Sequence, residues 1–257
     1  MTPNLLAICI GNTRTRFGAF AGDRLEQSVI VPNSNFTAVG GEIERSYRPI
    51  ADSGDALVMI ASTSAPMTGR VIEQVNKRLG VKVIRVEQDM PVPIGRQLDP
   101  EAIVGEDRLL NAAAAYDVMG QACVVVDAGT AVTIDFIDGT GTFHGGAIAP
   151  GIQIMLDGLA DGAAQLPEVE MEAPSEPIGH STVEAIRSGI FYGVRGMVRE
   201  LTEHYAEVAG SFPVVIATGG DADLLFKDFE MVDRIVPDLT LLGMRLTLLG
   251  PTRGKGR

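Results

Sequence analysis

The sequence contains no tryptophan, and phenylalanine and tyrosine bring the aromatic fraction to only 5% of its 257 residues. Proteins that bind single-stranded nucleic acids stack bases on such side chains. Basic residues are also a minority, with 21 Lys and Arg against 33 Asp and Glu and a formal net charge of -12. Because phosphate backbones bind clustered Lys and Arg, these shortages argue against a nucleic-acid partner. A phosphate-bearing small molecule would need a site made locally positive by a metal, backbone N–H groups or a few Arg side chains.

Cysteines and long apolar runs are scarce as well. The two cysteines, Cys9 and Cys123, both lie in strand-like apolar runs, which predicts reduced, buried thiols and no disulfide framework. No apolar stretch approaches the roughly 20 residues of a membrane-spanning helix, and the N-terminus lacks the basic region of a signal peptide. We therefore expect a cytoplasmic protein without a membrane partner.

What the sequence does contain is the composition of an ordinary globular protein, 46% hydrophobic and 21% charged. Its hydrophobic patterns indicate an α/β protein with one order of elements used twice: strand, strand, strand, helix, strand, helix. In the first half we expect strands at 5–10, 15–20, 25–31, 57–62 and 81–86 and helices at 71–79 and 103–118. In the second half we expect strands at 122–127, 132–137, 143–148 and 214–217, helices at 152–159 and 183–208, and a closing strand and helix within 232–249.

The two halves also match at their first turn, where Cys9-Ile-Gly-Asn-Thr aligns with Asp127-Ala-Gly-Thr-Ala. We interpret this as a duplicated fold with half-domains 1–119 and 120–257. Two such halves facing each other would form an interdomain cleft, the usual place for a small-molecule site.

Three glycine turns are candidates for phosphate binding: Gly11-Asn12-Thr13 followed by Arg14, Gly129-Thr130, and Gly219-Gly220. Glycine lets backbone N–H groups approach a phosphate, and the neighbouring hydroxyls can donate to its oxygens. Taken alone, each turn indicates only a hairpin that needs a residue with positive φ. Their equivalent places in a repeat favour nucleotide binding.

The segment Gly105-Glu-Asp107-Arg108 precedes an Ala-rich helix. Phosphorylation of an alcohol needs a carboxylate to accept the hydroxyl proton and benefits from a cation that holds an acidic acceptor. Asp107 and Arg108 have this chemistry, although a helix-capping Asp beside a surface Arg is the alternative.

Asp127 follows the apolar run Val124–Val126, and a carboxylate there needs a metal or hydrogen-bond donors. Mg²⁺ prefers such oxygen ligands, whereas a turn-forming Asp is the alternative. Gly145 and Gly146 are expected to shape an acceptor pocket or to serve close packing, and Thr182 could be only a helix N-cap. The histidines His144, His180 and His204 lack metal-ligand spacing and are expected to be structural.

Together these motifs resemble the type III pantothenate kinases. The resemblance is carried, in order, by Cys9-Ile-Gly-Asn-Thr-Arg, Gly105-Glu-Asp-Arg108, Asp127-Ala-Gly-Thr-Ala-Val-Thr133, Gly145-Gly-Ala-Ile-Ala-Pro-Gly151, Thr182 with Ser188-Gly189, and Thr218-Gly-Gly220. It implies two ribonuclease-H-like halves of the actin-like ATPase kind, and phosphorylation of pantothenate by ATP with Mg²⁺ and a monovalent cation, K⁺ or NH₄⁺, in a homodimer. It also implies that Asp107 is the catalytic base, and that Gly105, Arg108, Gly146 and Thr182 bind pantothenate.

Cys9 departs from the family pattern, which has Asp at this position. A thiol is mostly neutral near pH 7, and its thiolate is a soft ligand that suits Mg²⁺ poorly. This departure leaves open a catalytically impaired relative that binds ligand as a regulator. A kinase of another small alcohol also stays open, because similarity of fold does not fix the substrate.

Overall fold

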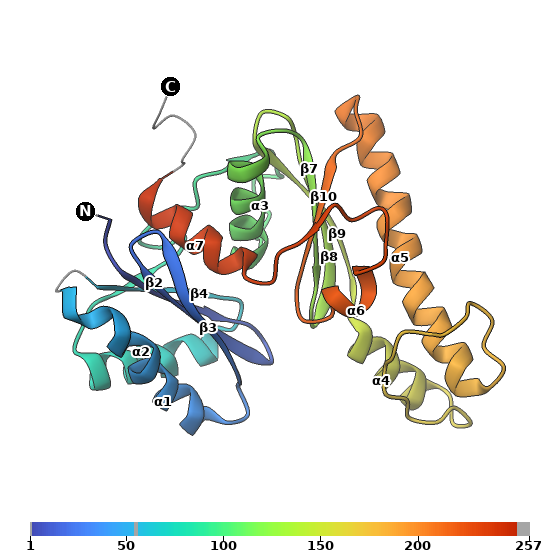
Figure 1. The fold of residues 1–257 in the computed structure, drawn as a ribbon, viewed down its shortest axis with the longest axis horizontal. Helices are drawn as coiled ribbons and strands as arrows, with labels where there is room; N and C mark the ends of the chain where they lie inside the picture. The colour runs from blue at the N-terminus through green and yellow to red at the C-terminus, as the bar shows by residue number, and fades with distance from the viewer. Residues whose placement is uncertain (1, 54–55, 251–257) are drawn as a thin grey trace. The chain divides into compact units, whose positions relative to one another are not determined.

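The computed structural model describes residues 2–53 and 56–250, which form two compact units (Figure 1). Among these residues, the first unit comprises those up to Ile94, Asp99–Asp117 and 238–250, and the second comprises Gly95–Leu98 and Val118–Pro237. The division near residue 118 lies beside the boundary that the sequence indicates. Segments 95–98 and 238–250, however, belong to the opposite unit from the one that a single boundary at residue 119 assigns to them.

The first unit is built around a five-stranded sheet in the order β3-β2-β1-β4-β5. Strand β1 is antiparallel to β2 and parallel to β4, β2 is antiparallel to β3, and β4 is parallel to β5. Its elements are β1 Leu5–Ile10, β2 Arg14–Ala21, β3 Arg24–Pro32, α1 Phe36–Tyr47, the 3₁₀ helix η1 Arg48–Ser53, β4 Leu57–Ser62, α2 Ala65–Leu79, β5 Val83–Arg85, α3 Glu106–Met119 and α7 Leu239–Leu249.

The second unit repeats this topology. Its sheet has the order β11-β10-β7-β8-β9-β6, so β9, β8, β7, β10 and β11 take the places of β3, β2, β1, β4 and β5. Its elements are β6 Gly95–Arg96, β7 Cys123–Ala128, β8 Ala131–Ile137, β9 Thr142–Pro150, α4 Ile152–Gly162, α5 Thr182–Ala209, β10 Val214–Thr218, α6 Ala222–Phe226 and β11 Arg234–Ile235. The duplication inferred from the sequence is therefore confirmed, and two ribonuclease-H-like halves make up the chain.

The two segments that cross between the halves do so for identifiable reasons. Residues 95–96 form β6, which pairs in parallel with Thr142 and Phe143 of β9 and adds an edge strand to the second sheet. Helix α7 packs within the first unit: the absence of a side chain at Gly18 leaves room for Leu241, and Arg245 Nε donates to the Gly22 carbonyl at 2.8 Å. Neither contact is local in sequence, which is why one boundary could not describe the division.

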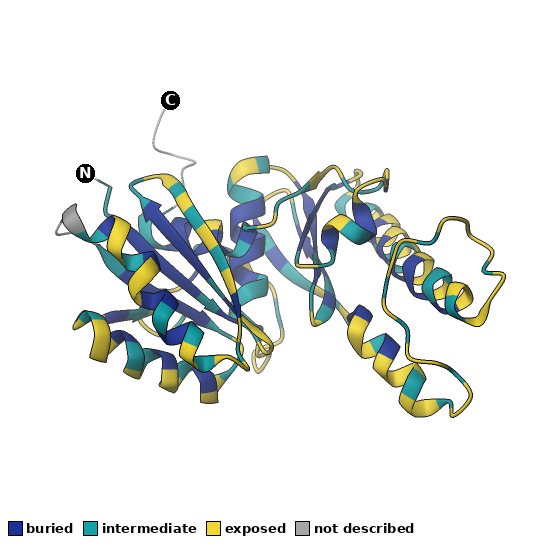
Figure 2. Cartoon of the chain, turned by 60° about the horizontal axis from the view of Figure 1, so that its bottom comes forward, coloured by how far each residue is buried: buried dark blue, intermediate teal, exposed yellow. Residues whose placement is uncertain are grey.

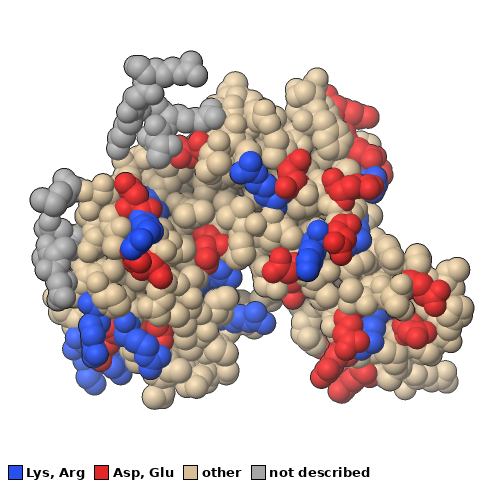
Figure 3. Space-filling view, viewed as in Figure 1, with Lys and Arg blue, Asp and Glu red and all other residues tan. Residues whose placement is uncertain are grey.

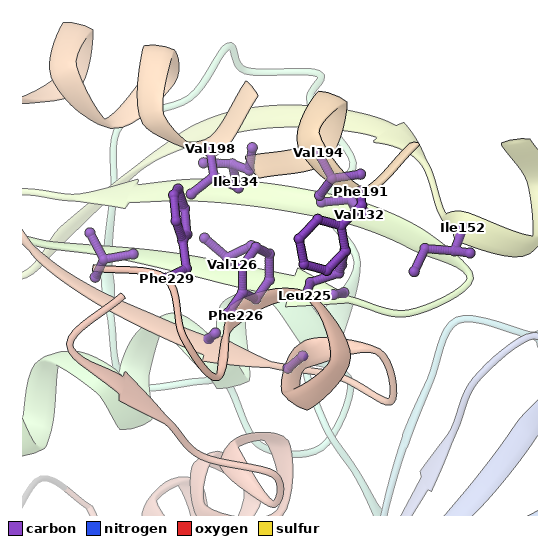
Figure 4. Packing of buried hydrophobic residues seen from close by; sticks show 14 of the residues in the cluster. Val126, Val132, Ile134, Ile152, Phe191, Val194, Val198, Leu225, Phe226 and Phe229 are labelled. Carbon is purple, nitrogen blue, oxygen red and sulfur yellow. The ribbon is translucent and has the colours of Figure 1, made fainter. Parts of the chain in front are cut away.

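Each unit has its own apolar core. In the first, residues of β1, β2 and β4 such as Ile8, Phe17 and Ile60 pack with Val39 and Ile43 of α1 and with α2. In the second, helix α5 presents buried residues at helical spacing, namely Ile186, Ile190, Phe191, Val194 and Val198, to the sheet. Figure 4 shows Val194 and Val198 beside Val132 and Ile134 of β8, with Leu225 and Phe226 of α6 on the same core. The outer faces of these helices are exposed (Figure 2).

Charge is unevenly spread over the surface. Lys and Arg side chains gather on the first unit around α1 and α2, while acidic side chains dominate elsewhere in the same view (Figure 3). The Arg side chains there are interleaved with Glu, as in the pairs Arg45–Glu42 and Arg78–Glu44. Within the described residues, no helix is long and apolar enough to cross a membrane.

Candidate active site

The turn between β1 and β2 is fixed by hydrogen bonds that leave its side chains exposed. The Gly11 N–H donates to the Arg14 carbonyl at 2.9 Å. Asn33, just after β3, donates from Nδ2 to the carbonyls of Gly11 and Asn12 at 2.9 and 3.1 Å, and from its backbone N–H to Thr13 at 2.9 Å. Asn12, Thr13 and Arg14 are exposed. A rigid turn with outward side chains suits a phosphate ligand, and Asn33 is a supporting residue that no sequence motif marks.

In the second unit, three glycine segments meet backbone to backbone. Gly129 donates to the Ala131 carbonyl at 2.9 Å, and the N–H of Gly151, the N-cap of α4, donates to the Thr130 carbonyl at 3.1 Å. Gly219 has φ +98° and lies against the backbone of Ala128. The predicted ATP-binding turns Gly129-Thr130 and Gly219-Gly220 are thus side by side, although they lie 90 residues apart in the chain.

This crowding gives a test at Gly151, where an added Cβ would overlap the carbonyl oxygens of Gly129 and Thr130. We expect Gly151→Ala to lower the free energy of unfolding by ~1–3 kcal/mol, as overpacking does, and to raise the KM for ATP by displacing the turn. Thermal melts and ATP titrations measure both effects. Gly162→Ala is the control because a Cβ there meets nothing within 4 Å, and equal behaviour of the two variants would contradict the expectation.

The predicted base lies on the first turn of α3, which begins at Glu106, three residues later than the sequence pattern indicates. Asp107 is half-buried, and its Oδ1 accepts the Arg108 N–H at 2.9 Å. Burial raises the pKa of the Asp107 carboxyl, while backbone N–H donors and the Arg108 charge act in the opposite direction. A carboxyl with a raised pKa is a stronger proton acceptor, so the environment of Asp107 fits a general base.

Glu106, for which no sequence motif predicts a role, is also half-buried. Its Oε2 accepts the backbone N–H of Ser62 at 2.7 Å. Burial raises the pKa of the Glu106 carboxyl, the Ser62 N–H lowers it, and the neighbouring Glu87 and Asp107 raise it further. The partner lies 44 residues away, so no local pattern could reveal this contact.

For two further site candidates in the second unit, Gly146 and Thr182, the structure tests the alternative to a binding role. A Cβ at Gly146 would overlap the Ile134 carbonyl of β8, so close strand packing by itself requires glycine there. Thr182 is exposed and is the first residue of α5, whereas the N-cap is Ser181, whose hydroxyl accepts the Glu184 N–H at 3.2 Å. The capping alternative for Thr182 is therefore wrong, and Thr182 lines an apolar groove between α4 and α5.

Cys9 and Asp127 occupy the same position in the two sheets, each being the fifth residue of a six-residue strand and two residues before the turn glycine. Both are half-buried. The expectation that Cys9 is buried is thus wrong, because its position near the end of β1 leaves its side chain partly accessible. Cys123 is buried, and burial raises the pKa of its thiol to about 12, which keeps it protonated and unreactive at neutral pH.

The surroundings of Asp127 are suited to a hard cation. Its neighbours across the strands are Thr133 of β8 and Thr218 of β10, and directly opposite residues share a face of the sheet. The Thr133 hydroxyl is buried and has no hydrogen-bond partner among the described residues. A carboxylate next to hydroxyl oxygens is the donor chemistry that Mg²⁺ accepts. No group of three or more His, Cys, Asp or Glu side chains arranged for a metal occurs in the described chain.

The histidines have carboxylate partners. His144 Nε2 lies 2.8 Å from Asp138 Oδ2, His180 Nε2 3.4 Å from Glu176 and His204 Nε2 3.2 Å from Glu200. The pairs of His180 and His204 lie on the exposed surface, and the structural role of the histidines stays a prediction.

Known proteins resemble this chain along nearly its whole length. The sequence profile of the family described as type III pantothenate kinase matches residues 5–204. The type III pantothenate kinase of Frankia alni is 38% identical over 251 residues, covering 94% of this chain and 97% of the relative. That of Parafrankia sp. is 40% identical over 245 residues, covering 94% and 96%.

Solved structures share the fold. A conserved Baf family protein from Campylobacter jejuni has a TM-score of 0.63 at 20% identity, covering 95% of this chain and 96% of that one. The ethanolamine utilization protein EutJ from Carboxydothermus hydrogenoformans has a TM-score of 0.57 at 15% identity, covering 96% and 90%. At such identities the likeness concerns architecture alone.

Proposed function

This chain belongs to the type III pantothenate kinase family, and from that membership we propose how its own residues carry out the family's reaction. The chain is a kinase that phosphorylates pantothenate in coenzyme A biosynthesis, with ATP as the phosphoryl donor. The observation that carries this function is the match to kinase relatives over 94% of the chain. The same match does not favour a regulator without activity.

Phosphate binding is assigned to the glycine turns. In the first unit the turn Gly11–Thr13, with Arg14, presents exposed polar side chains, and in the second unit Gly129, Thr130, Gly219 and Gly220 lie in the backbone cluster described above. Backbone N–H groups and hydroxyls bind phosphate oxygens without needing net positive charge on the protein. This is how a chain of net charge -12 can hold a polyanion.

Proton removal is assigned to Asp107. Its carboxylate accepts the proton of the primary hydroxyl of pantothenate as that oxygen bonds to the γ-phosphorus and the bond to the ADP oxygen breaks, giving ADP and 4′-phosphopantothenate. Arg108 pairs with the pantothenate carboxylate, an interaction that guanidinium geometry favours. Gly105, Gly146 and Thr182 complete the acceptor contacts in this proposal.

Asp127 is proposed to hold Mg²⁺, directly or through water, and the oxygen-rich surroundings of its strand support a cation there. When bound with ATP, Mg²⁺ would neutralise charge on the phosphates. A monovalent cation, K⁺ or NH₄⁺, is proposed as a second requirement. Because both cysteines are free and ATP is the donor, we place the reaction in the cytoplasm.

A homodimer is proposed on the groove between α4 and α5. This groove has a volume of about 780 Å³ and is lined mainly by apolar residues of the two helices, among them the partly exposed Ile154 and Leu159. Large exposed apolar surfaces mark protein interfaces. A second copy of the chain is the proposed occupant, and light scattering on the purified protein measures its mass.

The function is tested by incubating the purified protein with ATP, Mg²⁺, K⁺ and pantothenate and detecting 4′-phosphopantothenate. We expect product formation. Binding of pantothenate without turnover would contradict the proposal, and turnover only with a different small alcohol would reassign the acceptor.

Arg108→Ala tests whether Arg108 acts on pantothenate, the phosphoryl acceptor, or on ATP, the phosphoryl donor. We expect the KM for pantothenate to rise by about 10- to 100-fold, the size of a lost charge-assisted hydrogen bond, while the KM for ATP changes little. Steady-state kinetics with each substrate varied in turn provide the measurement. Equal increases in both constants would show that Arg108 does not act on pantothenate.

A further inference from the structure

The side chain of Glu106 connects two distant parts of the first unit. Glu106 is the first residue of α3, and its Oε2 accepts the N–H of Ser62, the last residue of β4, at 2.7 Å. A hydrogen bond between a carboxylate and a backbone N–H is short and strong compared with neutral ones. The start of the helix that carries Asp107 is therefore tied to the end of a central strand.

That strand leads directly to the phosphate-binding turn of the same unit. Ser62 lies opposite Ile10, the last residue of β1, and the Thr63 N–H donates to the Ile10 carbonyl at 3.0 Å. Gly11 is the next residue of the chain after Ile10. The path from Glu106 through Ser62 and Ile10 to Gly11 thus consists of one side-chain bond and the backbone of adjacent strands.

Neither exposure to water nor the helix dipole at the start of α3 is enough to explain why the Glu106 carboxylate lies where it does. A carboxylate in the first turn interacts favourably with the helix dipole even when fully exposed, but Glu106 is half-buried and lies beside the like charges of Glu87 and Asp107. Burial and like charges both cost free energy. The bond to Ser62 is the contact that offsets this cost.

We propose that Glu106 is a positioning residue, which holds Asp107 at a fixed distance from the Gly11–Thr13 turn through its bond to Ser62 and does not touch substrate. This inference rests on the proposed function, in which Asp107 is the base. A shift of about 1 Å in a catalytic group can lower the rate by about 100-fold. Loss of the bond should therefore act on kcat more than on substrate binding.

The test compares four variants of the full chain in the pantothenate assay. Glu106→Ala removes the acceptor, Glu106→Asp keeps the charge but shortens the side chain, and Glu106→Gln keeps an acceptor oxygen without the charge. Glu101→Ala, an exposed carboxylate five residues upstream, is the matched control. We expect kcat to fall by about 10- to 100-fold in the Ala and Asp variants, with the KM for ATP unchanged, and to stay near the wild-type value in the Gln and Glu101 variants.

Hydrogen exchange at the Ser62 amide supplies a readout independent of turnover. We expect its protection to fall in Glu106→Ala and Glu106→Asp and to remain in Glu106→Gln. Wild-type kcat in Glu106→Ala, or an equal loss of kcat in Glu106→Gln and Glu106→Ala, would overturn the inference. An inactive wild type with normal Ser62 protection would overturn the proposed function instead, which separates the two failures. If Glu106→Ala does not fold, the difference in kcat and in Ser62 protection between Glu106→Asp and Glu106→Gln tests the proposal.

Discussion

Asp107→Asn is expected to lower kcat for pantothenate phosphorylation by about 10²- to 10⁴-fold, the usual contribution of a general base. Asparagine has nearly the shape of aspartate but does not accept a proton at neutral pH. The Asp107 Oδ1 accepts the Arg108 N–H at 2.9 Å, and an amide oxygen can accept it too, so the fold and ATP binding should persist. Single-turnover kinetics and ATP titration measure the two properties separately. Turnover equal to that of the wild type would remove Asp107 from the mechanism.

The same residue predicts a pH dependence for the wild-type enzyme. Burial raises the pKa of the Asp107 carboxyl above its ordinary value, and only the ionised form accepts a proton. Activity should therefore be lost as the pH falls through this raised pKa, at a higher pH than for an exposed aspartate. A profile of kcat/KM against pH should show this acidic limb in the wild type, and the residual activity of Asp107→Asn should lack it.

Cys9→Asp is the second substitution with a large expected effect. Cys9 corresponds to Asp127 in the strand-by-strand match of the two sheets, and the substitution places a hard anionic ligand at the end of β1. We expect the Mg²⁺ concentration for half-maximal activity to fall by about tenfold, equivalent to ~1.4 kcal/mol of binding free energy. If the absence of this ligand limits turnover in the wild type, kcat should also be higher in Cys9→Asp. Magnesium titrations of activity measure both effects.

The control for this experiment is Cys9→Asn, which has the shape of the aspartate without its charge. Because Cys9 is only half-buried, both variants should fold, and only the charged one should change the Mg²⁺ requirement. An unchanged Mg²⁺ dependence in Cys9→Asp, together with a lowered melting temperature, would instead mean that Cys9 packs as a small hydrophobic residue and that the new carboxylate lacks a partner.

Elements whose pattern is local were predictable from the sequence. The predicted strand 5–10 and strand 57–62 coincide with β1 and β4, and the long helix at 183–208 lies within α5. Helix α1 is not predicted by the sequence pattern because Gly40 and Gly41 interrupt it. A Cβ added at Gly40 would lie close to the side-chain ends of Gln74 and Arg78 of α2. Strand β6, with two residues, exists only through its pairing with β9.

Among the residues of the candidate site, too, only some could be predicted from the sequence. The turn glycines could be found because the fold is duplicated, so that Gly11 and Gly129 mark equivalent positions in two sheets. The roles of Asn33 and Glu106 could not be found, since each depends on the hydrogen bonds described above to residues 20 or more positions away. At Gly146 the structure shows a packing requirement that the sequence could not distinguish from a binding one.

Helix α7 has a consequence for how the chain is made. It belongs to the first unit, where Gly243 lies against the backbone of Leu110 and Arg245 donates to the Gly22 carbonyl. A chain grows from its N-terminus at about 5–20 residues per second, so α7 leaves the ribosome on the order of ten seconds after residue 117. The second unit can be complete while the first still lacks a helix. The unit that is begun first is thus finished last, and until then the apolar surface beneath α7 is open to chaperones.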